Sequence, residues 1–360
     1  VAYPFLYEVP FITLATPGMD PRHSAVLGNV LNPAYVSNPL YDFPKPMSMW
    51  HRLCNTLILI GMVLYWRNWA IVPLIQKEIS PQFPELPSLL DLERNMSLAL
   101  LNTHFAIDTP LPLLPSQVEV GAMHCRPGNS LPQELESWIT GAGSAGVIYF
   151  SLGSFTRGTS MPTQYLDLFI QAFRKLPQRV IWKYEGELQD ISNNVMISKW
   201  LPQQDILAHD NVKVFITHCG LLSLQESIYH ATPLLALPIF GDQPKNGMFV
   251  KNSGLGDSLV WEELTVDMIV DTLTKITSDP KYIIICLYTI CCLYSTCWLY
   301  CISSIYSRVG GFPFLLRLTV RVRFKVASLF STCCGSDLNR VIRLSSIERR
   351  EVHNEVIRLT

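Results

Sequence analysis

The chain has 360 residues, enough for two or three domains with substantial cores, and this length excludes a peptide or a small disulfide scaffold. Apolar residues make up 49% of the chain and charged residues only 16%, a composition that excludes a disordered protein. The formal net charge is −1, so electrostatics give no support to nucleic acid as a partner.

The first residues resemble part of a folded unit rather than a targeting segment. Residues 1–18 contain no basic n-region and no short apolar core followed by a small-residue cleavage site, so no signal peptide is predicted. The run VPFITL, bounded by proline and glycine, is typical of a β-strand. We therefore expect the chain to begin inside a domain, as an N-terminally incomplete protein.

The apolar composition of residues 49–79 predicts a helix. The uncharged stretch within it, residues 53–66, has 14 residues, which is short for a membrane span and favours a buried helix or one that rests on a membrane. A proline-rich connection at 109–117 then leads to the glycine-rich residues 141–146. This composition predicts a domain boundary between about 118 and 145.

Between residues 147 and 278 the sequence alternates short apolar runs with longer segments of helical type. This alternation predicts a parallel sheet covered by helices on both faces. In such sheets ligands bind at the carboxyl ends of the strands, so we expect a site after the first and fourth apolar runs. The expected strands are 147–154, 179–184, 195–198, 212–218 and 233–238, and the expected helices are 162–176, 221–231 and 265–278.

The last fifth of the sequence differs in character from the rest. Residues 283–306 are 24 residues without a charge, long enough for a transmembrane helix, and basic sequence follows them. The basic flank would place the C-terminus in the cytosol and the folded part on the other side of the membrane. Five Cys, four Tyr and three Ser make this a weak hydrophobic span, so a membrane anchor and a tail that is not a native element both remain open.

The residues around the fourth apolar run have the features of a nucleotide site. The strand, loop and helix that meet at His218 would aim free backbone N–H groups at a diphosphate, and Gly220 lets the backbone approach a ligand closely. His218 and Ser223 can donate hydrogen bonds to phosphate oxygens. Glu226 lies three residues beyond Ser223 on the same helical face, as an acceptor for a ribose diol would. Trp200 offers a flat surface for stacking a base.

Each of these residues also has a structural interpretation. Taken alone, Trp200 would more often be a core aromatic, and His218 a structural histidine at a strand end. Their joint spacing favours nucleotide-sugar binding. Among the neighbouring residues, Cys219 is predicted to be a small filler, His209 and His230 structural, and Asp205 and Asp210 capping or solvated carboxylates.

The segment 200–243 resembles the signature box of the UDP-glycosyltransferases, which include animal UDP-glucuronosyl- and UDP-glucosyltransferases. It contains W-x-P-Q, T-H-x-G-x-x-S-x-x-E, P-x-x-x-x-P and a terminal D-Q at the family spacings. The flanking sequences NPAYV (32–36), RLCNT (52–56), SLGS (151–154) and SDPKY (278–282) look like those of animal members, so the resemblance covers residues 1 to about 282.

The resemblance implies a role for each matching residue. In the family the Trp stacks on uracil, the Gln helps to hold that base, the His and Ser contact the diphosphate, the Glu binds ribose, and the final acidic residue and Gln contact the donor sugar. One departure is Leu222, where many members have Asn. The donor-binding residues are therefore expected to be Ser151, Ser154, Trp200, Gln203, His218, Gly220, Ser223, Glu226, Asp242 and Gln243.

The resemblance also implies an α/β fold of the GT-B type, with two Rossmann-like domains. Residues 1–130 would be a partial N-terminal acceptor-side domain, and residues 140–281 the donor-binding C-terminal domain. Residues 282–360 would form an atypical tail, rich in Cys and apolar at first and then basic, with a candidate membrane segment at 283–306.

The implied reaction is an inverting transfer of glucose or glucuronate from UDP-glucose or UDP-glucuronate to a small lipophilic acceptor. No C-x-x-C pair, H-E-x-x-H or D-x-D occurs, so we expect neither a metal nor a cofactor besides the donor. The family's base is a His oriented by an Asp, and both are expected upstream of Val1, so no catalytic residue is assigned in this chain. Turnover by residues 1–360 is then expected to be at the limit of detection.

Two other functions remain open for this chain. It could be a catalytically inactive UDP-sugar-binding fragment, or a membrane-associated regulatory isoform that forms homo- or hetero-oligomers. The glycosylation sequon at Asn95 indicates a lumenal environment. With the candidate membrane segment it predicts an endoplasmic reticulum membrane protein with a lumenal donor domain.

Overall fold

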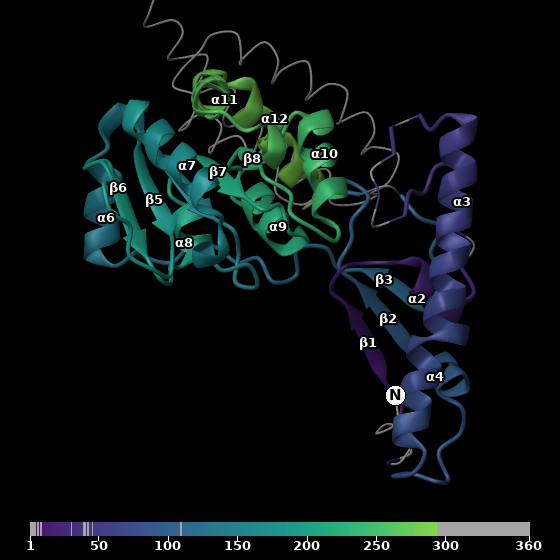
Figure 1. Cartoon of the computed structure of the whole chain (residues 1–360). Helices are drawn as coiled ribbons and strands as arrows, with labels where there is room; N and C mark the ends of the chain where they lie inside the picture. Colours follow the sequence, from purple (N-terminus) through teal and green to yellow (C-terminus); the bar gives the residue numbers. More distant parts are fainter. Residues whose placement is uncertain are drawn as a thin grey trace, which may run out of the picture. The chain divides into compact units, whose positions relative to one another are not determined.

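The computed structural model describes residues 5, 7, 9–29, 31–38, 41, 43, 44, 46–108 and 110–293. All of them belong to one compact unit, and the second unit, residues 303–360, lies outside the described residues. The described part contains two parallel sheets, a three-stranded one and a six-stranded one, with helices packed against them (Figure 1). The predicted α/β class is therefore confirmed.

The three-stranded sheet has the order β1-β2-β3, with β1 at Ile12–Ala15, β2 at Leu98–Leu101 and β3 at Gln117–Glu119. Its small core contains Ala15, Ala99 and Leu101. Two short helices, α2 (Pro21–Leu27) and α5 (Leu89–Arg94), connect these strands to the rest of the chain. The Asp20 side chain caps α2 by accepting hydrogen bonds from the backbone N–H groups of Arg22 and His23.

A long helical rod lies between β1 and β2 in the sequence (Figure 1). It comprises α3 (Met49–Val63), the π-helical η1 (Leu64–Trp69) and α4 (Ile71–Ile79). The predicted helix at 49–79 is confirmed, but only 17% of its most apolar window is buried, so the buried alternative is wrong. By length and composition alone, this helix could cross a membrane.

The six-stranded sheet has the order β6-β5-β4-β7-β8-β9, and all of its pairs are parallel. The chain first moves outward from β4 to β6 and then returns to pair β7 with β4, so its direction across the sheet reverses between these two strands. The strands are β4 (Val147–Ser151), β5 (Arg179–Lys183), β6 (Val195–Ser198), β7 (Val212–Thr217), β8 (Leu234–Ala236) and β9 (Gly256–Ser258).

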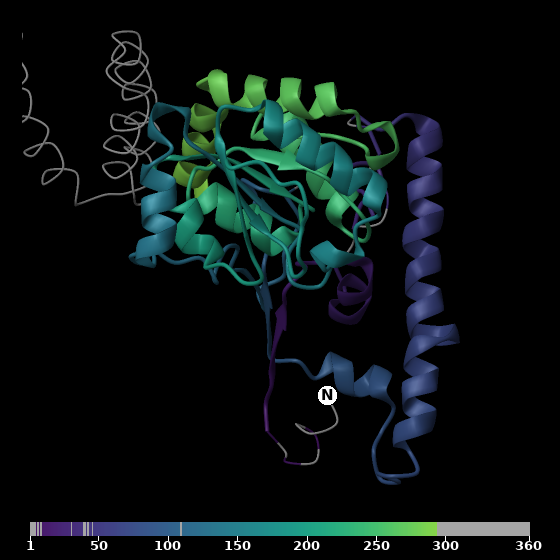
Figure 2. The ribbon, with the colours of Figure 1, turned by 60° about the vertical axis from the view of Figure 1, so that its left-hand side comes forward.

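Helices cover both faces of this sheet (Figure 2). On one face, Phe150 of β4 packs with Phe169 and Phe173 of α7 in the main core cluster, which also includes residues of α11. On the other, Tyr149 stacks on Phe215 with ring centroids 5.0 Å apart, on the side of α8 and α9. The helices are α6 (Gln133–Thr140), α7 (Thr163–Lys175), α8 (Gln203–Leu207), α9 (Leu221–Tyr229), α10 (Gln243–Ser253), α11 (Val266–Ser278) and α12 (Lys281–Leu293), with 3-10 turns η2 (Gly143–Ala145), η3 (Gly158–Ser160) and η4 (Trp261–Glu263).

The five expected strands and three expected helices of this half all form, each within three residues of the expected limits. The structure differs after residue 281, where α12 packs on α9 and buries Tyr282, Cys286 and Leu287. The first residues of the predicted tail 282–360 therefore contribute to the core around the six-stranded sheet. The described residues end at Leu293. The rest of the candidate membrane segment 283–306 and the basic region after it lie outside them.

Candidate functional site

The reversal of chain direction between β4 and β7 brings two loops together at the carboxyl ends of these strands. Ser151 is the last residue of β4 and Gly153 follows it, while His218 and Gly220 follow β7. A Cβ atom on Gly153 would lie 2.7 Å from Cε1 of His218, and one on Gly220 would lie 2.6 Å from its Nε2. Both glycines therefore make room for the imidazole ring, which sits between their backbones. The structure thus shows a close approach of Gly220 to His218, and its approach to a ligand stays a prediction.

His218 lies in an environment that favours its neutral form. Burial lowers its pKa, and the Asp242 carboxylate opposes this shift. A neutral imidazole keeps one N–H donor for an anionic ligand and adds no charge of its own. The next residue, Cys219, is fully buried with a φ of +65°, and burial raises the pKa of its thiol. Its protonated, enclosed thiol fits the small filler that the sequence predicts.

The N-terminus of α9 points to an anion site. Gly220 occupies its N-cap position and provides no side-chain hydrogen bond, so the first-turn N–H groups lack a side-chain cap. Such groups, together with the positive end of the helix dipole, attract phosphate oxygens. Ser223 lies in this first turn.

Three predicted residues meet directly beside this terminus. The amide nitrogen of Gln203 donates to Oγ of Ser223 at 3.1 Å and to Oε2 of Glu226 at 2.6 Å. Tyr149 donates its hydroxyl to Oε1 of Gln203 at 3.3 Å. Burial raises the pKa of Glu226, while hydrogen bonds from Gln203 and Gln204 act in the opposite direction. The structure thus clusters a partly buried carboxylate, a hydroxyl and an amide, a set suited to the hydroxyl groups of a ribose.

Trp200 is not a core residue. Its side chain is 73% exposed, and the ammonium of Lys183 lies 5.9 Å from the centre of its ring. The core alternative is therefore wrong. An exposed indole beside the ribose-type cluster leaves a flat apolar surface available for a base.

The last residues of the box, Asp242 and Gln243, lie at the N-terminus of α10. Gln243 is 5% exposed, and its Oε1 accepts hydrogen bonds from the backbone N–H groups of Ile239 and Phe240. Asn246 donates to Oδ2 of Asp242 at 2.7 Å and to the carbonyl of Cys219 at 3.0 Å. Gln243 and Asn246 thus shape the loop after β8 and join it to the loop after β7. No motif in the sequence singles out Asn246.

The two serines of the β4 loop have different surroundings. Ser151 is 1% exposed, and its hydroxyl accepts the backbone N–H of Gly153 at 3.3 Å. Ser154 is exposed. Ser151 therefore holds the loop, whereas Ser154 is accessible to a ligand.

The segment that connects the two sheets also reaches the site, through His124 and Arg126. Asp205 was expected to cap a helix or face solvent, and this prediction is wrong: it is 8% exposed and accepts two hydrogen bonds from the Arg126 guanidinium, at 2.6 and 3.0 Å. These hydrogen bonds lower the pKa of Asp205. Nε2 of His124 lies 3.7 Å from Oε1 of Glu226. No local pattern predicts these contacts, because the partners are about 80 to 100 residues apart in the sequence.

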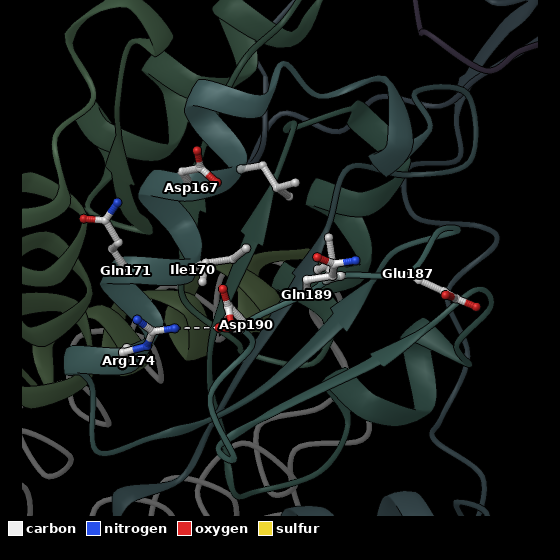
Figure 3. A pocket seen from close by; sticks show the side chains of 9 residues that line it. Asp167, Ile170, Gln171, Arg174, Glu187, Gln189 and Asp190 are labelled. Atoms are coloured by element: carbon white, nitrogen blue, oxygen red, sulfur yellow. Dashed lines mark hydrogen bonds between the residues drawn. The ribbon is translucent and has the colours of Figure 1, made fainter.

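Other chemistry is less well supported in the described part of the chain. No group of three or more His, Cys, Asp or Glu side chains suited to a metal ion occurs among the described residues. A hollow of about 380 Å³ lies between α7 and the loop after β5 (Figure 3). Arg174 crosses it to donate to the carbonyl of Asp190, and none of the predicted site residues lines it.

Comparisons with known proteins identify the family of the chain. Residues 4–290 match the family model described as "UDP-glucoronosyl and UDP-glucosyl transferase". The UDP-glycosyltransferase UGT5 of Dactylopius coccus is 39% identical over 281 residues, which are 77% of this chain and 53% of that protein. The UDP-glucuronosyltransferase 2B14 of Oryctolagus cuniculus is 31% identical over 286 residues, 78% of this chain and 51% of that protein.

Two solved structures share the fold. The glycosyltransferase of kitacinnamycin has a TM-score of 0.55 at 18% identity, over 82% of this chain and 68% of that one. The UDP-glucose: anthocyanidin 3-O-glucosyltransferase, solved in complex with UDP, has a TM-score of 0.53 at 18% identity, over 85% of this chain and 71% of that one. These likenesses confirm the predicted GT-B type of fold.

The chain is therefore an α/β protein with a fold of the glycosyltransferase type. More specifically, it belongs to the family of UDP-glucuronosyl- and UDP-glucosyltransferases, as the box at 200–243 indicates. It spans about half the length of the curated relatives it matches.

The packing of His218 against Gly153 gives a test of the site's construction. We expect Gly153→Ala to destabilise the protein more than Gly143→Ala, by a further ~1–3 kcal/mol, because a new Cβ would overlap the His218 ring. Gly143 is a matched control, since it also has a positive φ but nothing lies within 4 Å of its added Cβ. Urea unfolding measures the difference, and equal losses for the two variants would contradict the packing.

Proposed function

We propose that this chain provides the UDP-sugar-binding part of a hexosyltransferase. The observation that carries the proposal is the cluster of Gln203, Ser223 and Glu226 beside the N-terminus of α9. The exposed ring of Trp200 lies at the start of the same box and supports it. The proposed donor is UDP-glucose or UDP-glucuronate, since the relatives carry the names of both types of transferase.

Each part of the donor has a matching group in the chain. Trp200 stacks on uracil, and Glu226 accepts hydrogen bonds from the ribose hydroxyls. The N–H groups of α9, with His218 and the Ser223 hydroxyl, bind the diphosphate. Asp242 and Gln243 approach the sugar from the loop after β8. This arrangement is proposed from the residue types and their placement, and it needs neither a metal nor a further cofactor.

The proposed reaction is a displacement at the anomeric carbon with inversion. The acceptor oxygen forms a bond to that carbon, the bond from the carbon to the UDP oxygen breaks, and the electron pair leaves with UDP. The α9 N-terminus and the N–H of His218 stabilise the charge that develops on the departing diphosphate. We assign no base within residues 1–360 for the acceptor proton, so the chain by itself is proposed to bind the donor without efficient turnover.

Two exposed aromatic rings beside the site support a lipophilic acceptor. Phe155, 86% exposed, follows the β4 loop, and Phe240, 47% exposed, precedes Asp242. Their ring centroids are 5.7 Å apart in an edge-to-face arrangement. Exposed apolar rings next to a polar donor site would gain free energy by covering an apolar acceptor.

A second proposal concerns membrane association. Along α3 and η1, exposed apolar side chains recur at the spacing of one helical face: Trp50, Leu53, Leu57, Ile60 and Leu64. The sequon residue Asn95 is exposed, as a glycosylation site must be. We therefore propose that the protein lies on the lumenal side of the endoplasmic reticulum membrane, with this helical face against the lipid.

The ribose carboxylate gives the first test of the donor site. We expect Glu226→Ala to weaken UDP binding by about 1–3 kcal/mol, because the ribose hydroxyls would lose a charged acceptor in a buried position. Isothermal titration calorimetry measures the affinity. Glu136→Ala serves as the control, since Glu136 contacts a histidine outside the site, and an equal affinity of wild type and Glu226→Ala would contradict the assignment.

The pH dependence of UDP binding gives a second test. Burial raises the pKa of Glu226, and only the ionised carboxylate can accept hydrogen bonds with both oxygens. The affinity for UDP should therefore fall as the pH drops through this raised pKa. The fall should begin at a higher pH than it would for a Glu with an ordinary pKa. Calorimetry over a descending pH series should show the UDP affinity of wild type beginning to fall at a higher pH than an ordinary Glu would cause, and a flatter profile in Glu226→Gln. Identical profiles would exclude Glu226 as the titrating group.

The membrane proposal is tested by flotation with phosphatidylcholine and phosphatidylserine vesicles. Leu57→Glu combined with Ile60→Glu should reduce the floated fraction by about tenfold or more, because two apolar side chains lose contact with lipid. Val260→Glu changes an exposed apolar residue elsewhere and should leave flotation unchanged. Undiminished flotation of the double variant would show that another part of the chain binds the membrane.

A further inference from the structure

The connection between the two sheets is fastened to the proposed nucleotide site. We define residues 124–129 as the linker segment. Within it, the backbone N–H of Arg126 donates to Oε1 of Gln204 at 2.9 Å, and that of Asn129 donates to Oδ1 of Asp205 at 2.7 Å. A Cβ on Gly128 would lie 2.3 Å from Cβ of Ala208, so the backbone of the segment is closely packed on the end of α8. The linker segment is thus held along the whole length of this short helix.

The same segment meets the ribose-type carboxylate from one side. Nε2 of Gln204 lies 3.3 Å from Oε1 of Glu226 and 3.3 Å from the carbonyl oxygen of His124, to both of which it can donate. Nε2 of His124 lies 3.2 Å from the carbonyl oxygen of Leu222 and 3.7 Å from Oε1 of Glu226. Oε1 therefore faces the linker segment. The other oxygen, Oε2, accepts its hydrogen bond from Gln203.

We propose that His124 and Gln204 are positioning residues for Glu226: they hold Oε1 on the linker side, so that Oε2 is presented to the vicinal diol of a nucleoside ribose. The inference rests on the proposed UDP-sugar site and adds to it two residues outside the expected donor-binding set. Gln203 can release Oε2 to a ligand without losing every partner, since its amide also donates to Ser223. A carboxylate without the linker-side contacts could rotate, and its preference for a diol would fall.

The charges around Glu226 agree with this arrangement. The titratable groups that face it are His124, Cys125 and Arg126 on the linker segment and Tyr149 on β4, whereas its α8 neighbours Gln203 and Gln204 are neutral. Burial raises the pKa of the Cys125 thiol to about 12, so this group brings no negative charge to the site near neutral pH. Burial also raises the pKa of Glu226, and His124 and Arg126 oppose that shift.

The test compares UDP with 2′,3′-dideoxyuridine diphosphate, which lacks the diol. In wild type we expect UDP to bind at least about tenfold more tightly, the effect of a hydrogen-bonded charged acceptor. In His124→Phe and in Gln204→Leu this preference should shrink to about threefold or less, with the affinity for the dideoxy compound unchanged. In His124→Phe, the fall of UDP affinity with decreasing pH should also begin at a higher pH, because one group that stabilises the carboxylate is gone.

Three further variants separate positioning from a general structural effect. His124→Gln keeps a donor N–H near the position of Nε2 and should retain most of the preference. His209→Phe removes a histidine–carboxylate contact of similar length, 3.4 Å to Glu136, outside the site and should behave as wild type. His124→Phe placed on Glu226→Gln should cause no additional loss.

The outcomes that would overturn the inference are distinct. If His124→Phe and Gln204→Leu keep the wild-type preference for UDP, these residues do not position Glu226. If the variants lose UDP and the dideoxy compound equally, their role is structural, and the inference is also wrong. Wild type that binds both ligands equally would overturn the ribose role of Glu226 and this inference, while UDP binding itself would stand. Wild type that binds neither ligand would overturn the proposed function and this inference with it.

Discussion

The pairing of β4 with β7 is the constraint on which the rest of the site depends. Because the chain reverses its direction across the sheet between these strands, no crossover helix covers the gap between their carboxyl ends. The loops that follow them can then meet, and Gly153 and Gly220 let their backbones enclose the ring of His218. Strand β4 is buried over its whole length and β7 at every residue except Lys213, and both strands hold the two loops in place. Phe150 and Ile216 pack in the same core cluster.

The site combines exposed and buried groups that have different energetic consequences. Exposed Trp200 costs little to maintain and is available to a base. Glu226 is partly buried and therefore less favourable as an ion, since burial raises its pKa, and hydrogen bonds from Gln203 and Gln204 offset part of that cost. A carboxylate held in this way before the ligand arrives is pre-organised. Binding can then exchange one hydrogen-bond donor for another rather than order a mobile side chain.

The strands and helices of the donor half could be predicted from the sequence because their apolar periodicity is strong and local. The expected runs at 195–198 and 212–218 match β6 and β7 closely, and the spacing between Gln203 and Glu226 indicated their shared site. Short elements with little apolar content were not predicted. Strand β9 has the sequence Gly-Asp-Ser, which local propensity disfavours in a strand, and it forms because β8 offers a parallel edge.

Long-range contacts account for most of what the sequence did not indicate. The sequence predicted a capping or solvated carboxylate at Asp205. Its partner Arg126 lies 79 residues earlier in the chain, and no spacing rule connects the two residues. The apolar run after residue 281 has the composition of a membrane segment. Its first turns nevertheless pack against α9, and Cys286 and Leu287 are buried there. Hydrophobicity alone does not distinguish lipid from a protein core. The exposed face of α3 shows the same ambiguity in the opposite direction.

A crystal structure of residues 1–360 with UDP would test the account most directly. We expect the uracil ring to stack on Trp200, the ribose hydroxyls to contact Glu226, and the diphosphate to lie at the N-terminus of α9 within hydrogen-bond distance of His218 or Ser223. Density for UDP elsewhere, for instance in the hollow beside Arg174, with the α9 terminus occupied only by solvent, would contradict the proposed donor site.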